Sequence, residues 1–298
     1  MALDNRVVLV TGGARGMGRE YVRGFLKAGA KVIATDLSWE PSGASNDDFR
    51  FADELRDNPN VLVDVMDFTI DSHVKRVYEA AMARFGTIDV IVNNAGMRQR
   101  DLYPPHGSVT TLETEVGDWV SMFDGQLFGT VRVIKQFTPP MLEKRRGSIM
   151  TVASGGFNAS RPESKEMPYQ AAKAALVTMT LYMAHELKGS NIAANVILPG
   201  HTATTGSDEQ EAVRAAQRAK AAAAGATVWR PMRVTPDHVV PLALFLAEQD
   251  ANGVTGQVIN TTKWNEENGH GGADKWVYPA DRDDSNVRRP GAPAATGR

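Results

Sequence analysis

Short apolar runs alternate with longer amphipathic segments along most of the chain. The runs are continuously apolar and rich in β-branched residues, which is typical of strands buried on both faces; they lie at 6–12, 31–36, 60–64, 88–96, 147–154, 192–198 and 257–261. Between them, apolar residues recur at three- and four-residue spacing, which predicts helices over 16–28, 69–85, 119–143, 168–188 and 236–248. Strand and helix in repeated alternation predict an α/β fold: a doubly wound parallel sheet of about seven strands with helices on both faces.

Some segments fall outside this alternation. Residues 38–59 and 97–118 are polar connections with proline and glycine, longer than usual loops, and each has room for a short helix. An alanine-rich stretch with charges on one side predicts a helical flap at about 205–232. Residues 269–298, rich in Gly, Pro, Ala and Arg, cannot bury much apolar surface. We therefore expect one domain over 1–268, followed by a tail that is disordered, caps a pocket, or crosses onto a neighbouring subunit.

The composition restricts the class of protein. A formal net charge of −2 over 298 residues gives no broad basic field, which argues against a nucleic-acid-binding protein. The chain has no cysteine, which rules out disulfides and thiolate metal sites and fits a reducing compartment. With no leader peptide at the start and no stretch of ~18 apolar residues, we expect a cytoplasmic protein without a membrane partner. The six histidines show no metal-ligand spacing, and we expect His238 on a helix surface.

The stretch TGGARGMG at 11–18 closes the first strand and opens the first helix. Gly12 allows the tight turn, while Gly16 and Gly18 remove side chains where a pyrophosphate must approach the backbone and the positive end of the helix. Asp36 ends the second strand, and an acid at this spacing accepts hydrogen bonds from adenosine ribose hydroxyls in dinucleotide folds. Each feature alone also fits a simple turn or a capping aspartate; their relative positions favour a dinucleotide site.

The stretch PYQAAKAAL at 168–176 sets Tyr169 one helical turn before Lys173. Residues at this spacing lie on the same face of a helix, so the ammonium can lie beside the phenolic oxygen and favour its ionised form. The pair alone could equally be a coincidence on a helix surface.

Taken together, these motifs resemble those of the short-chain dehydrogenase/reductase family over residues 5–261. The glycine spacing is that family's version of the phosphate turn, and Tyr169 and Lys173 match its Y-x-x-x-K pair. NNAG at 93–96, Ser154 and PGHTAT at 199–204 match further family motifs in the right order, and DVMD at 64–67 resembles its adenine-contacting segment. The resemblance implies a Rossmann-type fold, a nicotinamide cofactor and a small-molecule substrate.

Particular roles follow from the resemblance. Tyr169 is the expected general acid/base, with its pKa lowered by Lys173 and the nicotinamide ring, and Ser154 orients the substrate oxygen. Lys173 also holds the nicotinamide ribose. The implied cofactor-binding residues are Gly12, Arg15, Gly16, Met17, Gly18, Asp36, Asp64, Val65, Asn93, Ala95, Gly96, Tyr169, Lys173, Pro199, Gly200, Thr202 and Thr204.

The chain departs from the family pattern in two places that matter for the site. Gln126 stands where the family commonly has an asparagine whose carbonyl takes part in a proton relay. Its neighbour Gly125 costs about 1 kcal/mol inside a helix and indicates a bend; Gln126 is either a catalytic residue or simply packs the helix. The segment between Ser154 and Tyr169 is longer than is common in the family, so it should reshape the substrate pocket.

These residues lead to a functional expectation. Asp36 would repel the extra phosphate of NADP by about 4 kcal/mol at ~4 Å and an effective dielectric of ~20, so NAD(H) is preferred, although Arg15 favours NADP(H). We expect an alcohol dehydrogenase or ketoreductase acting on a secondary alcohol or ketone that is apolar, cyclic or aromatic. Its pocket is expected to be lined by apolar and aromatic side chains, namely Phe157, Thr202, Trp229, Met97 and Tyr103.

The alternatives are an imine or enoyl reductase on the same scaffold, or a cofactor-binding sensor without turnover. By resemblance, a homotetramer or homodimer is expected, built on the helices at 119–143 and 168–188.

Overall fold

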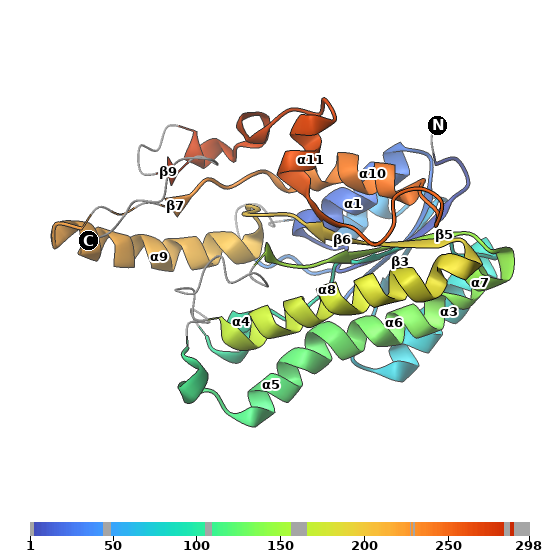
Figure 1. Ribbon diagram of the computed structural model, residues 1–298, viewed down its shortest axis with the longest axis horizontal. Helices are drawn as coiled ribbons and strands as arrows, with labels where there is room; N and C mark the ends of the chain where they lie inside the picture. The colour runs from blue at the N-terminus through green and yellow to red at the C-terminus, as the bar shows by residue number, and fades with distance from the viewer. Residues whose placement is uncertain are drawn as a thin grey trace.

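Seven parallel strands form the central sheet, in the order β3-β2-β1-β4-β5-β6-β8 (Figure 1). The computed structural model describes residues 3–43, 49–104, 109–155, 166–226, 228, 230–282 and 287–288. The order of the strands reverses at β1 and β4, which is the point where a doubly wound sheet opens a crevice at its carboxyl edge. The strands are β1 (Val7–Thr11), β2 (Lys31–Asp36), β3 (Val61–Val65), β4 (Val90–Asn93), β5 (Gly147–Val152), β6 (Ile192–Leu198) and β8 (Val258–Asn260).

Helices cover both faces of this sheet (Figure 1). Successive side chains of a strand point to opposite faces, so Val8 and Val10 of β1 pack in one core while Val7 and Leu9 pack in the other. The first core includes buried side chains of α1 (Gly16–Lys27) and α10 (Val240–Ala247). The second core includes side chains of α3 (Asp71–Phe85), α6 (Gly129–Phe137), α7 (Pro139–Lys144) and α8 (Met167–Leu187). The doubly wound α/β prediction is therefore confirmed.

The single helix predicted over 119–143 is instead divided into four parts. These are α5 (Val116–Phe123), a π-helical turn (Asp124–Phe128), α6 and α7. The bend expected at Gly125 is this π turn, where a Cβ on the glycine would lie 2.8 Å from Cβ of Met97. The Met97 N–H donates to the Gly125 carbonyl at 2.8 Å, so the close approach also ties the helix to the segment after β4.

Short helices lie within the two polar connections. The first contains α2 (Phe51–Leu55), and the second contains α4 (Gln99–Leu102) and a 3-10 turn (Thr111–Glu113). The predicted flap contains α9 (Thr205–Ala223), which begins at a capping box: Thr204 Oγ1 accepts from the Ser207 N–H, and the Thr204 N–H donates to Ser207 Oγ. The short strands β7 (Arg230–Pro231) and β9 (Val287–Arg288) pair beside it.

The described part of the tail packs on its own chain. After α11 (Thr261–Glu267), the 3-10 turns Ala273–Trp276 and Pro279–Asp281 lie along the segment that follows β7. The Tyr278 N–H donates to the Arg233 carbonyl at 2.9 Å, and Val277 and the Asp281 carboxylate are buried. The described part of the tail therefore buries more of its side chains than its composition predicts, because it packs against the segment that follows β7.

His238 is not on a helix surface as expected. It lies in a 3-10 turn (Pro236–Val239) before α10 and is fully buried. Among the helices that the structure describes, none is long and apolar enough to traverse a lipid bilayer.

Candidate active site

The turn after β1 depends on its glycines. Gly12 and Gly16 have φ of +69° and +53°, in the left-handed region that favours glycine. A Cβ on Gly18 would lie only 1.7 Å from the carbonyl oxygen of Gly12, and a Cβ on Gly12 would lie 2.9 Å from Nδ2 of Asn94. The turn can therefore close only if positions 12 and 18 carry no side chain. The absence of side chains there leaves the backbone and the start of α1 open to a ligand.

A cavity of about 620 Å³, here called the glycine-lined cavity, lies over this turn. It brings together residues of the turn, of the end of β2 and of the segment after β4. Of the predicted cofactor-binding residues, its lining includes Gly12, Arg15, Gly16, Met17, Gly18, Asp36, Ala95, Gly96 and Thr204. A side-chain-free cradle at the start of a helix suits the diphosphate of a dinucleotide.

Asp36 belongs to the lining of the glycine-lined cavity. Its Oδ2 accepts from the Ala14 N–H at 2.9 Å and its Oδ1 from the Leu37 N–H at 2.8 Å, which fixes the carboxylate at the end of β2. Burial raises the pKa of Asp36, while the Ala14 N–H and the charge of Arg15 oppose that rise. Arg15 itself donates to the Ser38 and Glu40 carbonyls, at 3.2 Å each.

Asp64 and Val65 lie outside the lining of this cavity. The Asp64 carboxylate pairs with Arg76 at 2.7 Å, and Val65 is 48% exposed. The segment instead reaches the cavity with Met66, Asp67 and Phe68, two residues later than predicted. Asn93 also lies outside the lining and is buried at the end of β4.

Tyr169 and Lys173 lie one turn apart at the start of α8, as predicted. Lys173 is 5% exposed; its Nζ donates to the Val152 carbonyl at the end of β5, at 2.9 Å, and lies 5.8 Å from the centroid of the Tyr169 ring. Burial lowers the pKa of Lys173 to about 8. Burial and then the charge of Glu166 raise the pKa of Tyr169, so the expected lowering by Lys173 does not follow from the protein's own groups.

A second cavity, of about 360 Å³ and here called the tyrosine-lined cavity, contains Ser154 and Tyr169 in its lining. It shares Arg98 and Thr204 with the glycine-lined cavity, so the two adjoin. Gly200 and Thr202, from the segment after β6, also line it, and their contact with a cofactor stays a prediction. The structure thus brings the serine, the tyrosine and that segment together.

The described lining of the tyrosine-lined cavity is polar, whereas the sequence predicted an apolar and aromatic pocket. Phe157 and Trp229, proposed for this pocket, lie outside the described residues. Met97 lines the glycine-lined cavity instead, and the Tyr103 hydroxyl donates to Asp118 away from both cavities. Sequence reasoning missed the charged residues that do line it, namely Arg98, Arg100, Glu166, Glu211, Arg218, Arg230 and Arg233. The arginines of WRPMR at 229–233 were the available signal.

His238 supports the segment after β6 and was also missed as a site residue. The two ring nitrogens of His238 each lie 2.8 Å from a carbonyl oxygen, one of Pro199 and the other of Thr235. The backbone carbonyl of His238 accepts a hydrogen bond from Nδ2 of Asn265. Desolvation lowers the pKa of His238, although the two carbonyls oppose that effect. The histidine thereby fixes Pro199 just before Gly200, which has φ of +74°.

Gln126 lies in the π turn and is 1% exposed. Its Nε2 donates to the Met97 carbonyl, and its own carbonyl accepts from Thr130 Oγ1 at 2.7 Å. A Cβ on Gly96 would lie 2.5 Å from Gln126 Oε1, so the amide packs directly on the NNAG segment. Gln126 lines neither cavity; its contacts are those of a residue that positions this segment, and its catalytic role stays a prediction.

A glycine cradle at the carboxyl edge of a doubly wound sheet, beside a Tyr–Lys pair and a serine, defines a nicotinamide-dependent oxidoreductase of the Rossmann class. The family model for short chain dehydrogenases matches residues 6–215. The chain belongs to that family, as the sequence motifs predicted.

Relatives of known activity and structure agree with this assignment. The chain is 42% identical to fluoren-9-ol dehydrogenase of Terrabacter sp. over 280 residues, 91% of this chain and 74% of that one. It is 32% identical to the 3-oxoacyl-(acyl-carrier-protein) reductase FabG of Thermotoga maritima, over 87% of this chain and 97% of the relative. The crystal structure of gox2181 is similar with a TM-score of 0.70 at 28% identity, covering 87% of this chain and 94% of that one.

The buried ammonium of Lys173 should leave a signature in the pH dependence of stability. The folded protein releases this proton near pH 8, whereas the unfolded chain keeps it up to the ordinary value of 10.5. In that window the unfolded state binds more protons, so the free energy of unfolding rises with pH. Relative to Lys173→Met, the wild type should gain up to about 3 kcal/mol between pH ~8 and ~10.

Urea unfolding of both proteins at each pH, at one protein concentration, measures this difference. The contributions of all other groups cancel in the comparison. A difference that stays flat would show that the pKa of Lys173 is unchanged by folding, and one that falls with pH would show that folding raises it; either result contradicts the prediction.

Proposed function

We propose that this protein is an NAD(H)-dependent dehydrogenase that interconverts a secondary alcohol and the corresponding ketone. The observation that carries the proposal is the adjacency of the two cavities: Ser154 and Tyr169 line one, the glycine turn lines the other, and both share Arg98 and Thr204. A substrate oxygen beside Tyr169 would therefore lie in the cavity that adjoins the proposed cofactor site. When bound there, a nicotinamide dinucleotide accepts or supplies the hydride.

The protein's own groups handle the proton. Tyr169 donates its phenolic proton to a ketone oxygen or receives one from an alcohol, and Ser154 holds that oxygen by a hydrogen bond. The phenol is protonated at neutral pH, as the acid in ketone reduction must be, although burial raises the pKa of Tyr169 and so makes it a weaker acid. Lys173 places a positive charge near the phenol of Tyr169, because its ammonium lies beside the tyrosine ring and is held there by its hydrogen bond to the end of β5.

NAD(H) is the proposed cofactor because of Asp36. Its carboxylate lines the glycine-lined cavity and is fixed by the Ala14 and Leu37 N–H groups. In dinucleotide-binding folds, an acidic residue at this position accepts hydrogen bonds from the adenosine ribose. Ribose hydroxyls can donate to it, whereas a phosphate on that ribose would be repelled. Arg15 favours the opposite choice, but it already donates to the carbonyls of Ser38 and Glu40.

The proposed substrate is a cyclic or aromatic ketone or secondary alcohol with an apolar ring framework. The likeness to a fluoren-9-ol dehydrogenase supports a rigid secondary alcohol of this kind. The described part of the tyrosine-lined cavity adds polar side chains around such a framework.

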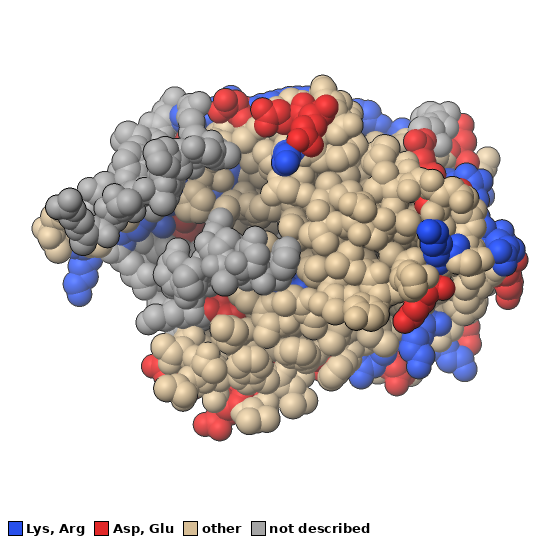
Figure 2. All heavy atoms as spheres, in the orientation of Figure 1, with Lys and Arg blue, Asp and Glu red and all other residues tan. Residues whose placement is uncertain are grey.

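We further propose assembly into a homodimer or homotetramer through the face of α5, α6 and α8. Figure 2 shows a broad surface without charged side chains in the lower part of the molecule, where Figure 1 places α5 and α8. Large apolar side chains are exposed on these helices and the π turn between them; they include Val120 (60%), Phe128 (46%) and Tyr182 (70%). Such a patch is typical of an interface between proteins.

Replacing the proposed proton donor gives the first test. Tyr169→Phe should lower kcat for reduction of a cyclic ketone by at least about a thousandfold, because the phenyl ring has no proton to donate. NADH affinity, measured by fluorescence titration, should stay within a few-fold. Tyr78→Phe, on α3 and in the lining of neither cavity, is the matched control and should behave as wild type. Near-normal turnover by Tyr169→Phe would show that Tyr169 is not the proton donor.

The cofactor assignment predicts a change of preference in Asp36→Asn. Loss of the carboxylate removes the repulsion of a ribose phosphate, so the ratio of kcat/KM with NADPH to that with NADH should rise at least about tenfold. Asp64→Asn neutralises a carboxylate that lies just outside the cavity and should leave the ratio unchanged. An unchanged ratio in Asp36→Asn would place the selecting residue elsewhere.

The interface is tested by placing a charge on the apolar face. Val120→Glu should convert the wild-type oligomer to smaller species in sedimentation velocity, because burying an unpaired carboxylate is costly. Phe49→Glu puts the same charge at a residue that is 40% exposed near α1 and should leave the sedimentation coefficient unchanged. A monomeric wild type would refute the assembly.

A further inference from the structure

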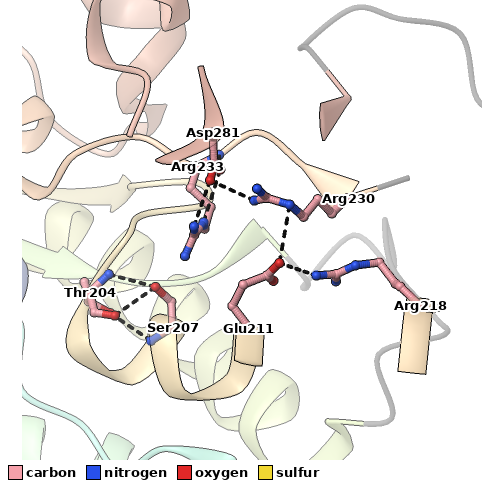
Figure 3. A network of polar contacts seen from close by, with 7 residues as sticks. All are labelled: Thr204, Ser207, Glu211, Arg218, Arg230, Arg233 and Asp281. Carbon is pink, nitrogen blue, oxygen red and sulfur yellow. Dashed lines mark hydrogen bonds and ion pairs between the residues drawn. The ribbon is translucent and has the colours of Figure 1, made fainter. Parts of the chain in front are cut away.

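Five charged side chains of alternating sign contact one another beside the tyrosine-lined cavity (Figure 3), and four of them belong to its lining. The Asp281 carboxylate lies between two guanidinium groups: Arg233 Nη2 is 2.7 Å from Oδ1, and Arg230 Nη1 is 2.8 Å from the same oxygen. Arg230 Nε in turn lies 3.4 Å from Oε1 of Glu211, which also pairs with Arg218. Three cations and two anions alternate, so these five side chains together carry one net positive charge.

These side chains come from three separate segments of the chain. Glu211 and Arg218 lie on α9, Arg230 and Arg233 lie on β7 and just after it, and Asp281 comes from the tail. Asp281 also accepts from the Arg233 backbone N–H at 3.0 Å, which fixes the carboxylate to the wall as well as to the guanidinium groups. Burial alone would raise the pKa of Asp281, but the hydrogen bonds from Arg233 and Arg230 outweigh that effect and lower it. The tail therefore locks both arginines in place.

Both arginines are unusually well buried for cationic residues. Arg230 is 8% exposed and Arg233 is 9% exposed, yet both belong to the lining of the cavity that contains Tyr169 and Ser154. Buried ion pairs rarely stabilise a fold better than apolar residues of the same size. Their position on a pocket wall therefore indicates a role toward a ligand.

The cavity as a whole favours an anion. Its described lining holds five arginines (Arg98, Arg100, Arg218, Arg230 and Arg233) and two glutamates (Glu166 and Glu211). The planar guanidinium group matches the geometry of a carboxylate and binds it more strongly than a neutral acceptor. Because Arg230 and Arg233 are recessed, the surface of a protein partner cannot reach them, whereas a small molecule inside the cavity can.

We propose that Arg230 and Arg233, positioned by Asp281, form a carboxylate subsite that makes the enzyme select ketones and secondary alcohols bearing an acidic group on their ring framework. The inference rests on the proposed function and defines its substrate class more narrowly. In this arrangement Tyr169 exchanges a proton with the reacting oxygen while Arg230 and Arg233 hold the carboxylate, and all three residues line the same cavity. Asp281 acts as a positioning residue, because it touches the arginines and does not line the cavity.

A matched pair of probes tests the subsite: fluorenone, and the positional isomers of fluorenone monocarboxylate. For the best isomer, the ratio of its kcat/KM with NADH to that of fluorenone should exceed about 10 in the wild type. Arg233→Gln should lower this ratio at least about tenfold, mainly through KM of the carboxylated ketone. A general loss of folded protein lowers both values equally and leaves the ratio unchanged.

Further variants keep the test decisive. Arg282→Gln removes an exposed arginine next to Asp281 and should leave the ratio unchanged. If Arg233→Gln does not fold, Arg218→Gln, which alters a partly exposed member of the same chain of charges, should still lower the ratio. Asp281→Asn should lower this ratio too, because Arg230 and Arg233 are then no longer held in position by the carboxylate. An unchanged ratio in the folded variants overturns the subsite.

Calorimetric titration of both probes into the enzyme–NADH complex separates this inference from the proposed function. If both ketones turn over in a Tyr169-dependent way and no carboxylated isomer is preferred, the subsite is overturned while the proposed function stands. If neither ketone is reduced, the proposed function fails for this substrate class, and the subsite is then judged from the binding measurements alone. Tighter binding of a carboxylated isomer that Arg233→Gln weakens at least about tenfold supports the subsite; equal binding of both probes overturns it.

Discussion

The hydrogen bond from the Lys173 ammonium to the Val152 carbonyl joins the two elements on which the site depends. It ties the second turn of α8, one turn after Tyr169, to the last residue of β5, two positions before Ser154. The bond is buried, so breaking it would leave both a charge and a carbonyl without water, at a cost of several kcal/mol. The relative positions of the tyrosine and the serine are therefore set by a contact that the fold cannot easily give up.

The same burial that fixes Lys173 also governs its charge. Desolvation lowers the pKa of the lysine to about 8 and raises that of Tyr169, so the protein alone keeps the tyrosine as an acid. A site in this state is suited to giving a proton to a developing alkoxide. In the opposite direction, an oxidised nicotinamide cofactor would, when bound, supply a positive ring that favours the ionised phenol.

The two adjoining cavities differ in the charges of their described linings. Three aspartates and two arginines line the glycine-lined cavity, whereas five arginines and two glutamates line the tyrosine-lined cavity. The tyrosine-lined cavity, which also contains Ser154 and Tyr169, therefore attracts anions more strongly than its neighbour does.

The sequence by itself determined the order and type of the main elements, the glycine turn, Asp36 and the Tyr169–Lys173 pair. These are local: each depends on the period of apolar residues, on backbone freedom at a glycine, or on two residues one helical turn apart. The tertiary structure alone decided that Arg230 and Arg233 line the tyrosine-lined cavity, that His238 is buried and that Asp281 pairs with both arginines. Arg233 and Asp281 are 48 residues apart in the chain, and a salt bridge between such residues has no period or spacing that a sequence could reveal. The pKa of Tyr169 belongs to the same class, because desolvation depends on everything packed around the ring and not on its neighbour four residues along the helix.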